Sequence, residues 1–266
     1  MTPYRLIATD LDGTLLRPDS SVSERSRRAI RQAQDAGLTV VFVTARPPRD
    51  IRELAGHAGL DGLSVCANGA MVYDIGADRV LHHQRLDAAL ALDLIYAVRA
   101  LDAEISFATE HGHKIGYEPA FPRFFDDFAH DHEPRVDHVH LLCEEETTKI
   151  LVHHPAHEAE HLAGLVRPLV AGRAEVISSG GPFIELGASG VSKASGLKWL
   201  CAHLGIGAEQ VIAFGDMTND LQMLRFAGHA VAVANAHPQV LEAADQVTAS
   251  NEDDGVARVI EALLAG

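Results

Sequence analysis

Two aspartates, Asp10 and Asp12, stand two positions apart directly after the apolar run Leu6-Ile7-Ala8-Thr9. Side chains alternate along an extended strand, so both carboxylates can share one side if the chain stays extended between them. Gly13 then allows a sharp turn. Open α/β sheets bind their ligands at the carboxyl ends of the strands. The pair is therefore well suited to hold a metal ion and a nucleophile.

Three further polar positions stand at the end of a predicted strand or the start of a predicted helix. Thr44 follows the strand predicted for 39–43, Asp216 follows the strand predicted for 211–214, and Lys193 begins a helix that Ser192 caps. The ends of parallel strands meet at one edge of a sheet, however far apart they lie in the sequence. We therefore expect these groups to lie together with the two aspartates.

This set of side chains favours a phosphoryl group as ligand. Asp10, Asp216 and Asp220 cannot all ionise at close range unless a cation lies among them. Oxygen ligands favour Mg²⁺ over Zn²⁺. Lys193 adds a positive charge at a helix start, which already suits anions. Neutral hydrogen bonds come from Thr44 and Asn219.

The same residues can carry out phosphoryl transfer, which depends mainly on positioning and charge neutralisation. Asp10 can attack phosphorus and form an aspartyl-phosphate. Asp12 can protonate the leaving oxygen and then deprotonate the water that resolves the intermediate. Mg²⁺ and Lys193 would screen the charge on the phosphoryl oxygens.

The elements that must position these groups alternate between short apolar runs and amphipathic stretches, which indicates βα units and a parallel sheet. Both ends of the chain follow this pattern. Strands are predicted at 5–9, 39–43, 64–67, 211–214 and 230–233, and helices at 23–37, 47–57, 192–203, 219–226 and 254–264.

The middle of the chain differs, because none of its strands ends in an acidic residue followed by glycine. Its predicted strands are 105–108, 139–142, 149–153 and 175–177, and its predicted helices are 87–101 and 156–166, the second ended by Pro168. We expect an α/β protein with a Rossmann-like core of residues 1–82 and 186–266, and an inserted α/β domain of residues 83–185.

Composition narrows the classes of function. The net charge of −15 argues against general nucleic-acid binding, which needs clustered cations. Three scattered cysteines argue against a disulfide framework and suit a reducing compartment. No apolar run approaches a membrane span and no signal peptide is visible. The expectation is a cytoplasmic protein with no nucleic-acid or membrane partner.

The motifs resemble those of the haloacid dehalogenase (HAD) superfamily. Asp10-Leu11-Asp12-Gly13-Thr14 resembles its first motif, Thr44 its second, Lys193 its third, and Gly215-Asp216-x-x-Asn219-Asp220 its fourth. The inserted domain between the second and third motifs resembles the cap of the Cof-like, type-IIB (C2B) branch. Smaller similarities are Ala67-Asn68-Gly69-Ala70, Gly190-Val191-Ser192-Lys193, Ala234-Asn235-Ala236 and the segment from Ser250 to Ala257.

The resemblance implies a role for each motif residue. Asp10 would be nucleophile and metal ligand, Asp12 the general acid/base with its backbone carbonyl on Mg²⁺, and Asp216 a further metal ligand. Substrate phosphate would be held by Thr44, Ala45, Arg46, Lys193 and Asn219. Asp220 would orient Lys193 or metal-bound water, and direct ligation by Asp220 stays open. Ala45 departs from the family, which often has glycine there.

The leading hypothesis is a Mg²⁺-dependent phosphatase acting on a small phosphorylated metabolite, such as a sugar phosphate or phosphorylated cofactor, as a monomer or homodimer. Asp12 fits the superfamily's phosphatase and phosphomutase pattern, so a sugar phosphomutase is the alternative. A binding regulator on an inactive scaffold would have lost some of these residues.

In the cap, Phe121, Phe124 and Phe125 are interpreted as core, and the pair His157 and His161 as solvated surface.

Overall fold

The computed structural model describes residues 3–124 and 134–266, so Phe125 lies outside the described residues. The chain divides into two compact units. The first comprises Met1–Arg46, Ile51–Leu81 and Ser192–Gly266, and the second Pro47–Asp50 and His82–Val191. The domain ranges expected from the sequence, 1–82 with 186–266 and 83–185, stay a prediction. Each unit is described by itself.

The first unit is built on an eight-stranded sheet in the order β14-β13-β12-β1-β2-β3-β4-β5. The strands from β14 to β3 are parallel, and β4 returns antiparallel to β3. In chain order they are Leu6–Thr9, Thr39–Val43, Leu63–Cys66, Met71–Asp74 and Arg79–His83 for β1 to β5, and Val211–Gly215, His229–Ala232 and Gln246–Val247 for β12 to β14. The central strand β1 is fully buried, as its apolar run predicts.

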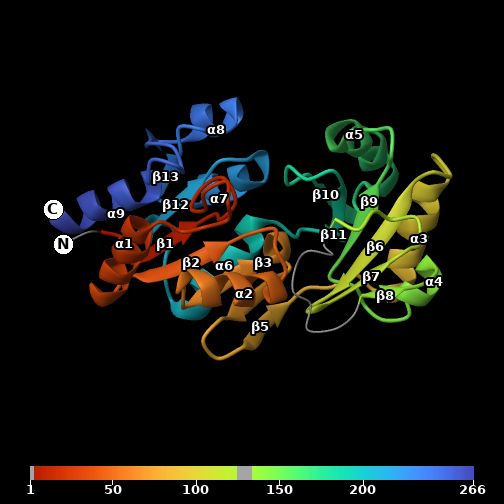
Figure 1. Ribbon diagram of the computed structural model, residues 1–266, viewed down its shortest axis with the longest axis horizontal. Coiled ribbons are helices and arrows are strands. Elements are labelled where there is room, and N and C mark those ends of the chain that lie inside the picture. Colours follow the sequence, from red (N-terminus) through yellow and green to blue (C-terminus); the bar gives the residue numbers. More distant parts are fainter. Residues whose placement is uncertain (1–2, 125–133) are drawn as a thin grey trace. The chain divides into compact units, whose positions relative to one another are not determined.

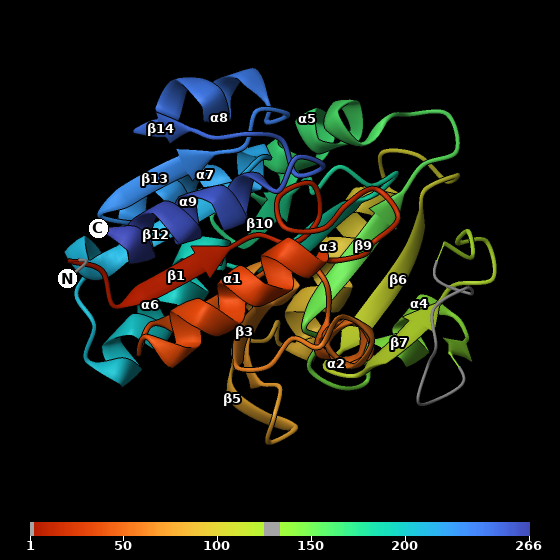
Figure 2. The ribbon, with the colours of Figure 1, turned by 60° about the vertical axis from the view of Figure 1, so that its left-hand side comes forward.

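Helices cover both faces of this sheet. On one face α1 and α9 lie side by side (Figure 2), and Arg25 of α1 pairs with Glu261 of α9 at 2.5 Å. On the other face α6 packs against α7. The helices are α1 Glu24–Asp35, α2 Pro48–Ala58, α6 Lys193–Leu204, α7 Leu221–Phe226, α8 Pro238–Ala243 and α9 Gly255–Ala265, with short 3₁₀ turns η1 Ala67–Gly69, η2 Ala208–Gln210 and η3 Thr218–Asp220.

The capping serines predicted from the sequence start their helices. Ser23 accepts the backbone N–H of Ser26 at 2.9 Å at the start of α1. Ser192 forms a reciprocal capping box with Ser195 at the start of α6. Gly205, in the left-handed conformation, ends α6. The cap at Ser192 fixes Lys193 as the first residue of its helix, which matters for the site below.

The second unit is a six-stranded, mainly antiparallel sheet in the order β10-β11-β9-β6-β7-β8, with α3 and α5 packed together beside it (Figure 1). The strands are β6 Ser106–His111, β7 Lys114–Tyr117, β8 Arg135–Val136, β9 Lys149–His153, β10 Ala174–Ile177 and β11 Ile184–Ala188. The helices are α3 Ala88–Arg99, α4 Val139–Leu142 and α5 Ala159–Val170.

Two details of this unit differ from the sequence prediction. Residues 139–142 form the short helix α4 instead of a strand, because a four-residue apolar run is compatible with either and Val139 and Leu142 are buried at helical spacing. Pro168 does not end α5, which continues to Val170. Burial of Val166 and Val170 on one face stabilises the last turn despite the missing N–H of the proline.

A buried ion network joins three strands of the second unit to Arg49. Arg49 donates to Glu110 of β6 at 2.8 Å, and Lys149 of β9 donates to Glu185 of β11 at 3.0 Å. Lys149 also lies 3.6 Å from Glu110. Burial alone would raise the pKa of Glu110, but Lys149 and Arg49 outweigh it and hold the pKa below its usual value. These contacts explain why Pro47–Asp50 groups with this unit.

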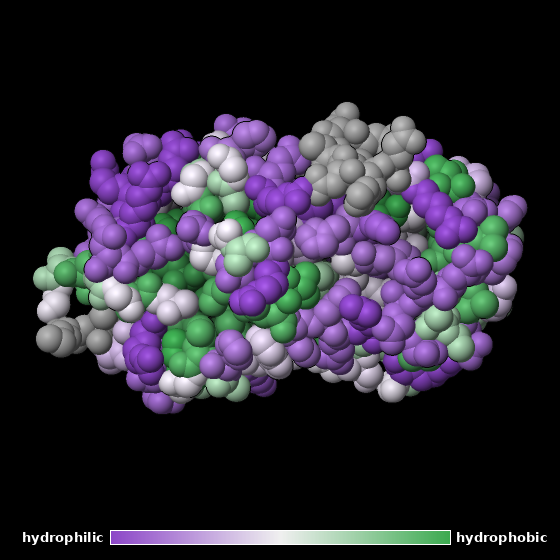
Figure 3. All heavy atoms as spheres, turned by 90° about the horizontal axis from the view of Figure 1, so that it is seen from below, coloured by the Kyte–Doolittle hydropathy of each residue, from purple (hydrophilic) through white to green (hydrophobic). Residues whose placement is uncertain are grey.

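On the face seen in Figure 3, apolar residues are interspersed with hydrophilic ones. Large apolar side chains that are exposed include Tyr96, Val136 and Val247. Among the described helices, none combines the length and the apolar character needed to cross a membrane.

Candidate active site

The loop after β1 places Asp10 beside Asp216. The N–H of Asp10 donates to the carbonyl of Phe214 at 3.0 Å, which continues the pairing of β1 with β12 for one more residue. Thr14 donates to Asp216 Oδ1 at 2.6 Å. Gly13 has φ +80°, and a Cβ there would overlap the Asp216 carboxylate. Glycine is therefore required both by the turn and by the close approach of Asp216.

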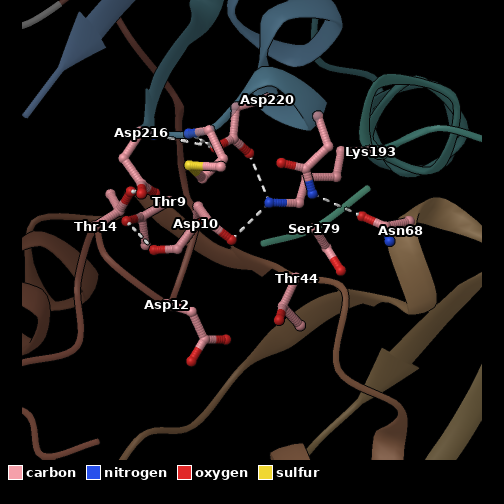
Figure 4. A network of polar contacts seen from close by, with 12 residues as sticks. Thr9, Asp10, Asp12, Thr14, Thr44, Asn68, Ser179, Lys193, Asp216 and Asp220 are labelled. Atoms are coloured by element: carbon pink, nitrogen blue, oxygen red, sulfur yellow. Dashed lines mark hydrogen bonds and ion pairs between the residues drawn. The ribbon is translucent and has the colours of Figure 1, made fainter. Parts of the chain in front are cut away.

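Lys193 joins the first, third and fourth motifs (Figure 4). Its buried ammonium donates to Asp10 Oδ1 at 2.7 Å and to Asp220 Oδ1 at 2.6 Å. The other oxygen of Asp220 accepts the backbone N–H groups of Asp216 and Met217, each at 3.0 Å. Both oxygens of Asp220 are thus engaged, which favours an orienting role for it over direct metal ligation.

Burial and mutual repulsion control the charges of the cluster. Burial raises the pKa of Asp10 well above its usual value, and the Asp220 charge raises it further, although Lys193 opposes both. Burial also raises the pKa of Asp216. Burial alone would lower the pKa of Lys193, but Asp10 and Asp220 outweigh it and raise it. Lys193 therefore stays a cation.

The residues present fit a divalent cation. One ligand oxygen from each of Asp10, Asp216 and Asp220 lies within 4.8 Å of the others. Three carboxylates and one ammonium leave two negative charges uncompensated if all ionise. Asp10 and Asp216 each have an oxygen outside the hydrogen bonds described above, and a hard ion such as Mg²⁺ prefers such oxygens. Asp10, Asp12 and Asp216 are the predicted ligands. Asp10 and Asp216 would hold the ion with their side chains.

Asp12 lies in a different environment from Asp10. Its side chain is 52% exposed, and both oxygens accept from Arg46, from Nε at 2.8 Å and from Nη2 at 2.5 Å. This fork is the strong bidentate form of an arginine–carboxylate pair. The two aspartates of the motif are therefore held by different cations.

The segment Thr44-Ala45-Arg46 forms a turn at the end of β2. Thr44 is fully buried, its N–H donates to Val65 O at 2.8 Å, and its Oγ1 accepts the N–H of Arg46 at 3.0 Å. The hydroxyl hydrogen of Thr44 is left to donate to an anion. Ala45 has a negative φ, so alanine is accommodated without backbone strain where the family often has glycine.

Asn219 lies in η3 and meets a residue that the sequence prediction left out of the site. Its Nδ2 donates to Asn68 Oδ1 at 3.0 Å, and its own Oδ1 is buried without a hydrogen-bond partner. Asn235 was likewise missed as a contact: its Nδ2 donates to Gly13 O at 2.8 Å, and its Oδ1 accepts the N–H of Asn251 at 3.0 Å. The short segments that contain Asn68 and Asn235 are noted in the sequence as family similarities, but the sequence does not indicate the partners of these two side chains.

Comparisons with known proteins identify the family of this chain. Residues 7–260 match the sequence profile of haloacid dehalogenase-like hydrolases. The chain belongs to this family. It is 32% identical over 270 residues to the Bacillus subtilis (strain 168) 5-amino-6-(5-phospho-D-ribitylamino)uracil phosphatase YitU, covering 97% of each chain. It is 30% identical to the HMP-PP phosphatase of Serratia proteamaculans (strain 568), covering 89% of this chain and 86% of that protein.

A solved structure supports the type-IIB fold. The chain superposes on a HAD subclass IIB sugar phosphatase with a TM-score of 0.83, covering 97% of this chain and 98% of that one. Because the two sequences are only 23% identical, this similarity supports the fold and not a shared function. The predicted family, the α/β fold with a cap and the enzyme class, a phosphatase, are confirmed. The roles assigned to individual site residues stay predictions.

The cap residues singled out in the sequence give no second catalytic cluster among the described residues. Phe121 is 2% exposed and packs with Tyr117 and Phe183, as the core interpretation predicts. Asp102, Glu104 and His154 come close together. The Nδ1 of His154 accepts the N–H of Ala156 at 3.0 Å, and its Nε2 lies 3.3 Å from Asp102, whose side chain is 43% exposed, so we interpret this group as surface ion pairing.

Proposed function

We propose that this chain hydrolyses phosphomonoesters of small metabolites with Mg²⁺, through an aspartyl-phosphate on Asp10. The observation that carries the proposal is the placement of Asp10: one oxygen is bound by Lys193, while the neighbouring Asp216 adds negative charge that a divalent cation would balance. Such a site attracts a cation together with an anion.

The residues have distinct tasks in the proposed reaction. The free oxygen of Asp10 attacks phosphorus, the P–O bond to the leaving group breaks, and Asp12 gives a proton to the departing oxygen. Asp12 then removes a proton from water, which attacks the aspartyl-phosphate and releases inorganic phosphate. Thr44, Lys193 and Asn219 bind the phosphoryl oxygens. Bound Mg²⁺, held by Asp10 and Asp216, would supply charge neutralisation.

The relatives support a small metabolite as substrate. The substrate in the name of YitU is a phosphate ester of a ribityl chain attached to a uracil ring, and the second relative is also named a phosphatase. We infer the same broad class here, a sugar phosphate or phosphorylated cofactor precursor. The cytoplasmic location and the state of monomer or homodimer stay predictions.

Phosphate release from a panel of small phosphomonoesters tests the proposal. Wild-type protein is assayed with Mg²⁺ and with EDTA, next to Asp10→Asn and a control, Asp19→Asn, whose carboxylate is exposed. We expect release that requires Mg²⁺, is lost in Asp10→Asn and persists in Asp19→Asn. Isomerised sugar phosphate without net phosphate release would instead indicate the phosphomutase. Release unaffected by EDTA would contradict the metal requirement.

A further inference from the structure

A strained turn contacts two parts of the proposed phosphate site, the loop of Thr44 and the start of α6. Ala67, Asn68 and Gly69, which form η1 after β3, all have positive φ, at 51°, 54° and 101°. All three are buried. Alanine adopts this conformation rarely, and consecutive left-handed residues that are not glycine are uncommon. Such strain persists only where the surrounding structure enforces it, and it concentrates at functional sites.

The backbone of the turn is bonded to the loop of the second motif. The N–H of Asn68 donates to Thr44 O at 3.0 Å, and the N–H of Ala67 donates to Arg46 O at 2.9 Å. These bonds require the two amides to face the Thr44 loop, which the left-handed conformation achieves. The strained turn therefore supports the residue proposed to bind phosphate.

The other side of the turn contacts the start of α6. A Cβ at Gly69 would overlap the carbonyl of Ser192 and lie 3.1 Å from the nitrogen of Lys193. A Cβ at Gly196 would lie 2.9 Å from Gly69 Cα. Two glycines thus allow the backbone of the turn to reach the helix end that presents Lys193.

The side chain of Asn68 completes the connection to the fourth motif. Its Oδ1 accepts from Asn219 Nδ2, and Asn68 is 1% exposed, so the bond is shielded from water. One N–H of the Asn219 amide is used in this way. The second N–H of the same amide then has a fixed direction and is available to a phosphoryl oxygen.

We propose that Asn68 is a positioning residue that orients the Asn219 amide toward the substrate phosphate. The inference rests on the proposed function, because it assigns Asn219 to phosphate binding. Asn68 acts through Asn219 and does not itself touch the reacting atoms. The left-handed turn serves to bring Asn68, the Thr44 loop and the start of α6 to one place.

A double-mutant cycle tests the inference. Asn68→Gly removes the side-chain amide and keeps the left-handed backbone without strain. It is made in wild type and in Asn219→Ala. The matched control is Ser20→Gly, an exposed position at φ 61° outside the site. The readouts are kcat and KM with the best phosphomonoester, the calorimetric Kd for inorganic phosphate with Mg²⁺, and the thermal midpoint.

We expect Asn68→Gly to lower kcat/KM and raise the phosphate Kd by about fivefold, the effect of one lost hydrogen bond, while the variant stays folded at the assay temperature, which the thermal midpoint checks. In Asn219→Ala the same substitution should change either value by less than about twofold. Equal effects in both backgrounds would show that Asn68 acts independently and overturn the inference. If wild type releases no phosphate from any ester, the proposed function fails, while the phosphate Kd still decides the role of Asn68.

Discussion

Replacing the proposed nucleophile, Asp10→Asn, should abolish activity and at the same time stabilise the metal-free protein. Asp10 is 4% exposed and lies among other carboxylates. Burial and the Asp220 charge raise its pKa, so the folded state binds this proton more tightly than the unfolded state does. By linkage, folding stability falls as pH rises from about 4 through the folded pKa. Asparagine does not ionise, so Asp10→Asn removes this loss of folding stability at neutral pH.

The magnitude follows from the distances. At an effective dielectric constant of about 20, a carboxylate pair within 4.8 Å repels by at least about 3.5 kcal/mol, and Asp10 faces two such partners. The attraction between Asp10 and Lys193, whose charged atoms lie 2.7 Å apart, offsets about 6 kcal/mol of this repulsion. Repulsion thus slightly exceeds attraction before the cost of burying the ion is added. Because wild type relieves part of this by binding a proton, we expect a gain of about 1–2 kcal/mol at pH 7.

The assay is thermal or urea unfolding in EDTA at pH 7, where the gain corresponds to roughly 2–8 °C. The matched control is Asp12→Asn, which should also inactivate the enzyme but removes a half-exposed ion pair with Arg46 worth at most about 1 kcal/mol. Saturating Mg²⁺ should stabilise wild type more than Asp10→Asn. An Asp10→Asn protein that is less stable than wild type in EDTA would refute the reasoning, because attraction to Lys193 would then outweigh repulsion and burial.

Further substitutions test other contacts. Gly13→Ala should weaken Mg²⁺ binding at least about tenfold in a metal titration, because the new Cβ overlaps the Asp216 carboxylate. Thr44→Val should raise KM about fivefold, since one hydrogen bond to phosphate is lost, and should lower stability by about 1 kcal/mol, because the N–H of Arg46 loses its acceptor. Burial lowers the pKa of His83 to about 4, so stability falls as pH drops from 6.5 toward 4. His83→Gln can still donate to Thr148, and it should reduce this loss of unfolding free energy at acid pH by about 1 kcal/mol, as measured by urea unfolding. An unchanged dependence of stability on pH would contradict the prediction.

The sequence was sufficient to predict that Asp10, Lys193 and Asp216 lie close together. Asp10 and Asp216 follow strands β1 and β12, which are neighbours in a parallel sheet, and Lys193 follows a capping serine. In each case the position depends on a local signal, a strand end or a cap, combined with one rule about parallel sheets. Asp220 was left between two roles, and its hydrogen bonds favour the orienting one.

The supporting residues could not be found in this way. Asn68 reaches Asn219 across 151 positions of sequence, and Asn235 reaches Gly13 across 222. An asparagine in a turn carries no signal for its distant partner, because its own backbone preference already explains its presence. Residues 139–142 show the same limit for secondary structure, since their short apolar run fits a helix and a strand equally well.

Spacing alone also does not explain how one motif could supply both a nucleophile and an acid/base, the roles proposed for Asp10 and Asp12. The buried Leu11 separates the two aspartates, so that Asp10 is enclosed with Lys193 and Asp12 is half exposed beside Arg46. Lys193 holds one oxygen of Asp10 and leaves the other for attack. Arg46 binds both oxygens of Asp12, so these two hydrogen bonds would have to break before Asp12 could give a proton in the proposed reaction. Two identical side chains thus acquire different chemistry from the cation that each one meets.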